Sequence, residues 1–309
     1  MVRAYSPSGI LPPRFLFDLL LLLKSYDFIE FMDCSAASLQ PAKLMRTEAE
    51  LKAFYEQEHE VWKANNLKRQ RIEINILQDC DHGVVETEEI CAFESAFGIK
   101  ATTALFARRG AETNERRQYE IDFSHMAMLQ KRGMLFSYHA NAWEMSGFDE
   151  ERHVQFFNED LAFLEAQGLQ IDCFSPHGAR PSPDGRHNAS FFAPAFACKP
   201  LVWTHNRIAP RGARQGDGDL WPRLRSGDPT SDIRNYLLKH LAWGRRLWIL
   251  FHPQYYSGSS PDLVTGMSAL PWPAEYWHGY QSGRPLAYWD PVRRHLDQLT
   301  GKGIFRYAL

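Results

Sequence analysis

The chain has 309 residues, a formal net charge of −2 at pH 7, 44% hydrophobic residues and 23% charged residues. These are globular values, and the length suits either two ordinary domains or one large α/β barrel. The near-neutral charge argues against a nucleic-acid-binding surface, because phosphate binding needs clustered, uncompensated Lys and Arg.

The five cysteines are odd in number and form no CxxC pair. Such usage disfavours a disulfide framework and a thiolate zinc site, and it fits reduced thiols in a cytoplasmic protein. An apolar run at residues 19–23 lies between Asp18 and Lys24 and is too short to cross a membrane. We therefore expect a cytoplasmic protein without an integral membrane segment.

Residues 1–70 are expected to form an N-terminal extension that packs on the following domain. Its predicted elements are a core helix at 15–26, a short strand at 28–32 and a polar helix at 47–65. No group of ligand-type side chains occurs in this part of the sequence.

From Arg71 onward the pattern changes to alternating strands and helices. We predict strands at 72–77, 99–106, 134–139, 169–175, 201–204 and 247–251, and intervening helices near 90–97, 121–129, 154–164 and 231–243. Segments 182–195 and 209–230 are rich in Gly, Pro, Arg and Asp and are predicted to be long loops, and a last helix is expected at 291–299. Repeated strand-then-helix order indicates a parallel sheet, either doubly wound or closed into a barrel.

Acidic and imidazole side chains follow the predicted strands. Because the carboxyl ends of parallel strands meet on one face, these side chains should converge there. Carboxylates with several imidazoles are a typical composition for a site holding zinc or another borderline divalent ion. A solvated Asp-rich turn is the competing interpretation of the first group, and His205 could merely end a strand. The residues concerned are Asp79, Asp81, His82, His139, His177, His205 and His252.

The other histidines have simpler interpretations. His125 falls on the apolar side of its predicted helix, where a core or boundary histidine is expected. His153 lies in a polar helical context and is expected at the surface.

Five short motifs in order make the stretch from 71 to 256 resemble the polysaccharide deacetylases. This is the NodB-homology group, also called carbohydrate esterase family four, and the resemblance is to its divergent members with an Asp-x-Asp-His motif. The motifs are Asp79-Cys80-Asp81-His82, residues 98–102, residues 136–139, residues 174–178 and residues 251–256.

The resemblance implies an α/β fold, namely a distorted (β/α) barrel at 71–256, with the helical extension before it and an irregular C-terminal tail at 257–309. It also implies metal-dependent hydrolysis of an N-acyl group, usually N-acetyl, on an amino sugar. By this analogy Asp79 is the general base, Asp81 and His139 are metal ligands, and His252 is the acid that protonates the leaving amine. Zinc is the expected metal, with nickel or cobalt as alternatives.

The sequence departs from the family pattern at one ligand. Trp143 stands where the family usually has a second metal histidine, so we expect His177, or failing that His82, to complete the site. Arg180 is expected to orient the catalytic Asp or bind substrate. Trp143, His205 and Tyr255 are further candidates for substrate contact.

Two other classes of function compete with a carbohydrate deacetylase. Loss of the usual ligand at Trp143 would suit a catalytically lapsed carbohydrate-binding or scaffold protein of the same fold. A hydrolase of a different small amide is the third possibility. The sequence predicts neither the exact substrate nor an oligomeric state.

Overall fold

A computed structural model describes most of the chain, in eight segments. These are residues 13–34, 47–81, 84–108, 121–178, 181–204, 213–216, 233–256 and 289–300.

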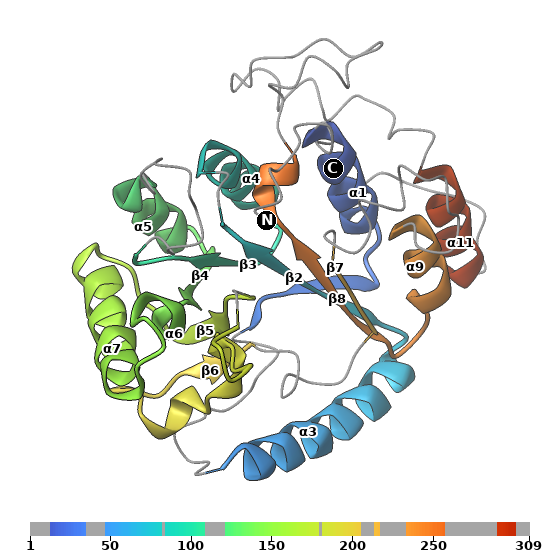
Figure 1. The fold of residues 1–309 in the computed structure, drawn as a ribbon. Helices are drawn as coiled ribbons and strands as arrows, with labels where there is room; N and C mark the ends of the chain where they lie inside the picture. The colour runs from blue at the N-terminus through green and yellow to red at the C-terminus, as the bar shows by residue number, and fades with distance from the viewer. Residues whose placement is uncertain are drawn as a thin grey trace.

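Eight strands and eight α-helices are defined in this part of the chain (Figure 1). The strands are β1 (Ile29–Met32), β2 (Ile72–Asp79), β3 (Thr102–Leu105), β4 (Leu135–Ala140), β5 (Cys173–Pro176), β6 (Val202–Trp203), β7 (Ala213–Gly216) and β8 (Arg246–Phe251). The helices are α1 (Pro13–Lys24), α3 (Glu48–Arg69), α4 (Val84–Phe97), α5 (Phe123–Lys131), α6 (Ala142–Met145), α7 (Glu150–Ala166), α9 (Ile233–His240) and α11 (Asp290–Thr300). Short 3-10 turns lie at η2 (Asn188–Ser190), η3 (Ala193–Ala195) and η4 (Pro253–Tyr255).

The strands form one curled parallel sheet in the order β6-β5-β4-β3-β2-β8-β7. Every pairing in it is parallel, and helices surround the strands (Figure 1). In this order β6 and β7 are the two ends, so the sheet follows the strand sequence of a barrel that is open between them. The expected α/β fold with a distorted barrel is confirmed.

The central strand β2 is buried on both faces, as is usual for a strand of a parallel sheet. Its polar residues are therefore paired. Glu73 Oε1 lies 2.6 Å from Arg246 Nε, and Asn75 Nδ2 donates to the carbonyl oxygen of Met32 at 2.9 Å. These interactions let polar residues alternate with Ile72, Ile74 and Ile76 inside the core.

Strand β1 belongs to the same sheet, although it lies within the expected N-terminal extension. It pairs with residues 72–75 of β2, and β3 pairs with residues 77–79 of the same strand. Because β8 pairs with 73–78 from the other side, β1 and β3 share one edge of β2. The junction is closed by the amide of Cys34, which donates to Thr102 Oγ1 at 2.8 Å.

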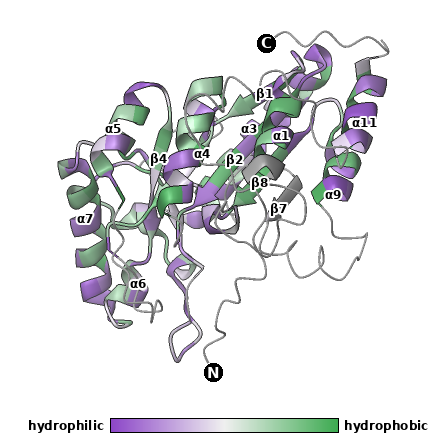
Figure 2. Ribbon diagram, turned by 90° about the horizontal axis from the view of Figure 1, so that it is seen from above, coloured by the Kyte–Doolittle hydropathy of each residue, from purple (hydrophilic) through white to green (hydrophobic). Residues whose placement is uncertain are grey.

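Helix α1 is a core helix, as the sequence predicts. All of its leucines except Leu21 are almost fully buried, and Phe17 stacks on Phe93 of α4 with ring centroids 4.0 Å apart. Figure 2 shows α1 as largely hydrophobic and α11 as largely hydrophilic. Among the described helices, none combines the length and the apolar character that crossing a membrane requires.

Helix α4 ends where the sequence predicts. Gly98 has φ +61°, a left-handed conformation that glycine adopts without strain. The following amide, of Ile99, donates to the carbonyl oxygen of Glu94 at 2.8 Å and closes the helix.

Two predicted loops contain regular structure. Segment 209–230 includes β7, which pairs with residues 247–250 of β8. Its sequence, Ala-Arg-Gln-Gly, has no alternation of apolar residues. Such a sequence can still form a strand at the end of a sheet, since main-chain hydrogen bonds alone can hold it there. Segment 182–195 contains η2 and η3.

Candidate metal centre

Five side chains that the sequence predicts for the site come from the carboxyl ends of four strands. Asp79 is the last residue of β2 and Asp81 follows two positions later, His139 lies near the end of β4, and His177 and His252 directly follow β5 and β8. The parallel sheet turns all four strand ends to one side, and the curl draws them together.

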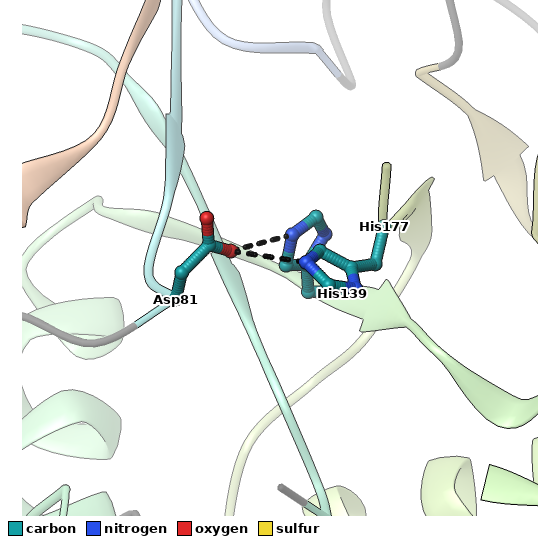
Figure 3. Close-up of side chains that lie close together, drawn as sticks. All are labelled: Asp81, His139 and His177. Atoms are coloured by element: carbon teal, nitrogen blue, oxygen red, sulfur yellow. Dashed lines mark hydrogen bonds and ion pairs between the residues drawn. The ribbon is translucent and has the colours of Figure 1, made fainter. Parts of the chain in front are cut away.

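The centre of the group is the Oδ1 atom of Asp81 (Figure 3). It lies 3.1 Å from His139 Nε2 and 3.8 Å from His177 Nε2. One potential ligand atom from each of these three residues lies within 4.8 Å of the other two. In a tetrahedral zinc site, ligand atoms at about 2.1 Å from the ion are about 3.4 Å apart, so the three side chains fit such an ion.

The orientation of His139 supports this fit. Its Nδ1 lies 3.1 Å from the carbonyl oxygen of Ser175, which can only accept a hydrogen bond. Nδ1 is therefore the donor, and Nε2 faces Asp81. A histidine held in this way by its other ring nitrogen is the usual arrangement at a metal site.

The charges at the centre stabilise one another. Burial acts to raise the pKa of Asp81, but the hydrogen bond with His139 and the positive charges of His177, His139 and His252 outweigh it and lower that pKa. Burial acts to lower the pKa of His139, but Asp79 and Asp81 outweigh it and raise that pKa. Asp81 is therefore ionised, and a metal ion must compete with a proton for Nε2 of His139.

Asp79 and His252 flank the group on different sides. Asp79 Oδ2 lies 3.9 Å from His139 Nε2. His252 Nε2 lies 3.8 Å from the other carboxylate oxygen of Asp81, Oδ2, to which Gln254 Nε2 also donates at 3.4 Å. The two oxygens of Asp81 thus have separate neighbours, with His139 and His177 at one and His252 and Gln254 at the other.

Two neighbours of the group were not predicted from the sequence. The ring of Phe106 lies 4.7 Å from that of His139 and 5.1 Å from that of His177, which gives the site an apolar wall. The carboxylate of Glu144 lies 3.9 Å from Nδ1 of His177. Phe106 directly follows β3 and could have been included by the same strand-end reasoning, whereas the sequence around Glu144 has no such signal.

The expectation that Trp143 contacts substrate is not met. Its side chain is 1% exposed, with Phe191 4.6 Å from its ring and the guanidinium of Arg186 4.7 Å above it. Its indole nitrogen donates to the carbonyl oxygen of Arg186 at 3.3 Å. Because these neighbours cover the ring, Trp143 is a packing residue here and offers no stacking face.

His153 is buried, which corrects the prediction of a surface residue. It is 3% exposed, because its ring packs among those of Trp143, Phe191 and Phe196. Burial lowers its pKa from 6.5 to about 4, so it is neutral at physiological pH.

Cys80, which lies between the two acids Asp79 and Asp81 in the sequence, is also buried. It accepts a hydrogen bond from Thr87 Oγ1 of α4 at 2.8 Å and is therefore a packing residue.

Three predicted site residues lie outside the described part of the chain, namely His82, Arg180 and His205. The side chain of Tyr255 is outside it as well, although its backbone forms the end of η4. Their roles stay predictions.

No protein-family model and no curated protein matches this chain. Among solved structures, it is similar to a mutant of a CE4 family pseudoenzyme with restored enzymatic activity, with a TM-score of 0.36, 13% identity and coverage of 74% of this chain and 63% of that one. The wild-type form of that pseudoenzyme, from Bacillus anthracis, gives a TM-score of 0.35 and 12% identity over 58% of this chain and 54% of that one.

The chain therefore matches less than two thirds of the length of either structure. Both belong to the family that the sequence motifs resemble. At these TM-scores the likeness carries no argument about chemistry, and the fold assignment rests on the sheet topology described above.

Proposed function

We propose that this chain is a metal-dependent hydrolase that removes an N-acyl group, in particular N-acetyl, from an amino sugar or a glycan precursor. The observation that carries the proposal is the convergence of Asp81, His139 and His177 with a further carboxylate and a further imidazole beside them. Amide hydrolysis needs a base for water and an acid for the leaving amine, and this site offers a candidate for each.

Asp81, His139 and His177 would hold the ion, with zinc favoured by the oxygen and nitrogen donors and nickel or cobalt as alternatives. When bound, such an ion polarises the amide carbonyl and lowers the pKa of water. The remaining steps belong to side chains of this chain.

Asp79 is the proposed base. Its Oδ2 would accept a proton from water as the oxygen of that water bonds to the amide carbon. Asp79 is largely buried, and its Oδ2 lies 3.9 Å from Nε2 of His139, next to the three ligand atoms.

His252 is the proposed acid. Its Nε2 would donate a proton to the amide nitrogen as the carbon–nitrogen bond breaks, which releases the amine and a carboxylic acid. The neighbouring Oδ2 of Asp81 would stabilise the imidazolium before that transfer. Arg180, His205 and Tyr255 are proposed to bind the sugar.

We further propose a cytoplasmic location and a substrate made inside the cell. All five cysteines are free, and four of them are buried, which suits a reducing compartment.

The second candidate is a catalytically lapsed carbohydrate-binding or scaffold protein. One observation favours it, because Trp143, at the position of a usual metal ligand, is fully packed and cannot be a ligand. A lapsed protein would bind glycan after complete chelation of metal ions, whereas a hydrolase would lose its activity.

Elemental analysis of the purified protein tests the proposal. We expect one divalent ion per chain in the wild-type protein, which should release acetate from N-acetyl sugars. The Asp81→Ala and His139→Ala variants should lose both the ion and this activity. His125→Ala is the matched control, because His125 lies on α5 with its side chain 31% exposed and should leave metal content unchanged. A wild-type protein that contains no divalent ion and takes up none would refute the hydrolase.

A further inference from the structure

Glu144 is a buried acid beside the candidate metal centre. It lies in α6, directly after Trp143, and is 7% exposed. Its Oε2 lies 3.9 Å from Nδ1 of His177, and both atoms are buried. We propose that Glu144 is a positioning residue that fixes the ring of His177 with Nε2 toward Asp81. This inference rests on the proposed metal site and names what completes it.

The two ring nitrogens of His177 face different carboxylates. Nε2 lies 3.8 Å from Asp81 Oδ1, on the metal side, and Nδ1 lies on the Glu144 side. If Nδ1 carries the hydrogen and Glu144 attracts it, the lone pair of Nε2 is free to bind a cation. A carboxylate in this place also makes the imidazole a stronger ligand.

His139 provides an internal comparison. Its Nδ1 faces the carbonyl oxygen of Ser175 at 3.1 Å, and its Nε2 also points at Asp81 Oδ1. Both histidines therefore present the same nitrogen to the centre and have an acceptor behind the other one. For His177 the acceptor is an anion.

The backbone around Glu144 and His177 is tied together by Asn188. Its Oδ1 accepts from the amide of Trp143 at 3.1 Å, and its Nδ2 donates to the carbonyl oxygen of His177 at 3.2 Å. The indole of Trp143 adds a further bond, to the carbonyl oxygen of Arg186. These bonds hold α6 against the segment that follows β5, so Glu144 has a defined position relative to the ring.

This arrangement gives a physical role to Trp143, which stands where the family usually has a second metal histidine. Trp143 cannot bind metal, but it anchors α6, and the next residue supplies a carboxylate to the histidine that takes the place of the missing ligand.

Nitrogen-15 NMR of the metal-free protein, at a pH where the imidazole is neutral, measures which ring nitrogen of His177 carries the hydrogen. Competition with a chromophoric chelator measures the affinity for zinc.

We expect the wild-type protein to have the hydrogen of His177 on Nδ1. Glu144→Gln should give a mixture of the two tautomers and about tenfold weaker zinc binding, with an unchanged unfolding temperature. Glu144→Asp, which keeps the charge but shortens the side chain, should have an intermediate effect. Glu150→Gln is the matched control, because Glu150 has a side chain that is 69% exposed and pairs with Arg186.

A wild-type His177 with its hydrogen on Nε2, or a Glu144→Gln protein with unchanged tautomer and zinc affinity, would overturn the inference. The two proposals fail separately. If the wild-type protein binds neither zinc nor nickel nor cobalt, but the tautomer of His177 depends on Glu144, the positioning role stands and the hydrolase is refuted.

Discussion

Replacing Glu94 with glutamine should stabilise the protein at neutral pH and leave its stability near pH 4.5 unchanged. Glu94 lies on α4 and is completely buried, where Gln78 Nε2 of β2 donates to its Oε1 at 2.5 Å. Thr103 Oγ1 donates in turn to Gln78 Oε1 at 3.3 Å. Burial raises the pKa of Glu94 from 4.5 to about 8, and the hydrogen bond from Gln78 lowers it less strongly.

The sign and the size of this stability change follow from the difference in the pKa of Glu94 between the folded and the unfolded chain. In the unfolded chain Glu94 ionises above pH 4.5, whereas in the folded protein it stays protonated to about pH 8. Its contribution to stability is thus fully present below pH 4.5 and is lost as the pH rises toward 8. Each pKa unit corresponds to about 1.4 kcal/mol, so the loss at pH 7 is about 3 kcal/mol.

Urea unfolding of the wild-type protein and of Glu94→Gln, at several pH values from 4.5 to 8, measures this effect. The amide keeps the shape of the side chain and an oxygen that can accept from Gln78, but it has no proton to lose. The free energies of unfolding should agree at pH 4.5 and differ by about 3 kcal/mol at pH 7, with the variant more stable. A difference that does not depend on pH would show that Glu94 is not a buried neutral acid.

Two more predictions use other buried groups. The pKa of His153 is lowered from 6.5 to about 4 by burial, so stability should fall as the pH drops from 6.5 to 4. In urea unfolding, His153→Phe should have the same free energy of unfolding as the wild-type protein at pH 7.5 and one about 3 kcal/mol higher at pH 4. A variant that is as sensitive to acid as the wild-type protein would contradict the burial of His153. A thiol reagent should modify one cysteine quickly in the native protein, because Cys198 is exposed and Cys34, Cys80, Cys91 and Cys173 are buried. Cys198→Ser should remove that fast phase, and a fast phase that persists would mean that one of the other four is accessible.

The order of strands and helices could be predicted because each buried strand has a run of apolar residues and several helices end at a glycine. The predicted helix around Ile90 ends at Gly98, and the structure has α4 end there with a left-handed glycine. Strand β7 could not be predicted, since main-chain pairing at an end strand requires no particular side chains.

The group at the strand ends could be predicted for a similar reason. The positions of Asp79, His139 and His252 relative to their strands follow from the local sequence, and parallel topology places strand ends on one side. Glu144 and His153 could not be recognised, because a titratable residue in a helix looks the same in sequence whether it faces solvent or a buried partner. Only the packing of α6 against α7 in the folded protein distinguishes the exposed from the buried case.

The way in which β1 and β3 divide one edge of β2 has a consequence for making fragments of this protein. A fragment starting at residue 71, where the pattern of the sequence changes, would lack β1 and leave the backbone of residues 72–75 without its partner strand. It would also lose α1 and expose the face of Phe93 on which Phe17 stacks. An open strand edge beside a bare apolar surface favours association between chains, so such a fragment should aggregate unless it begins before Pro13.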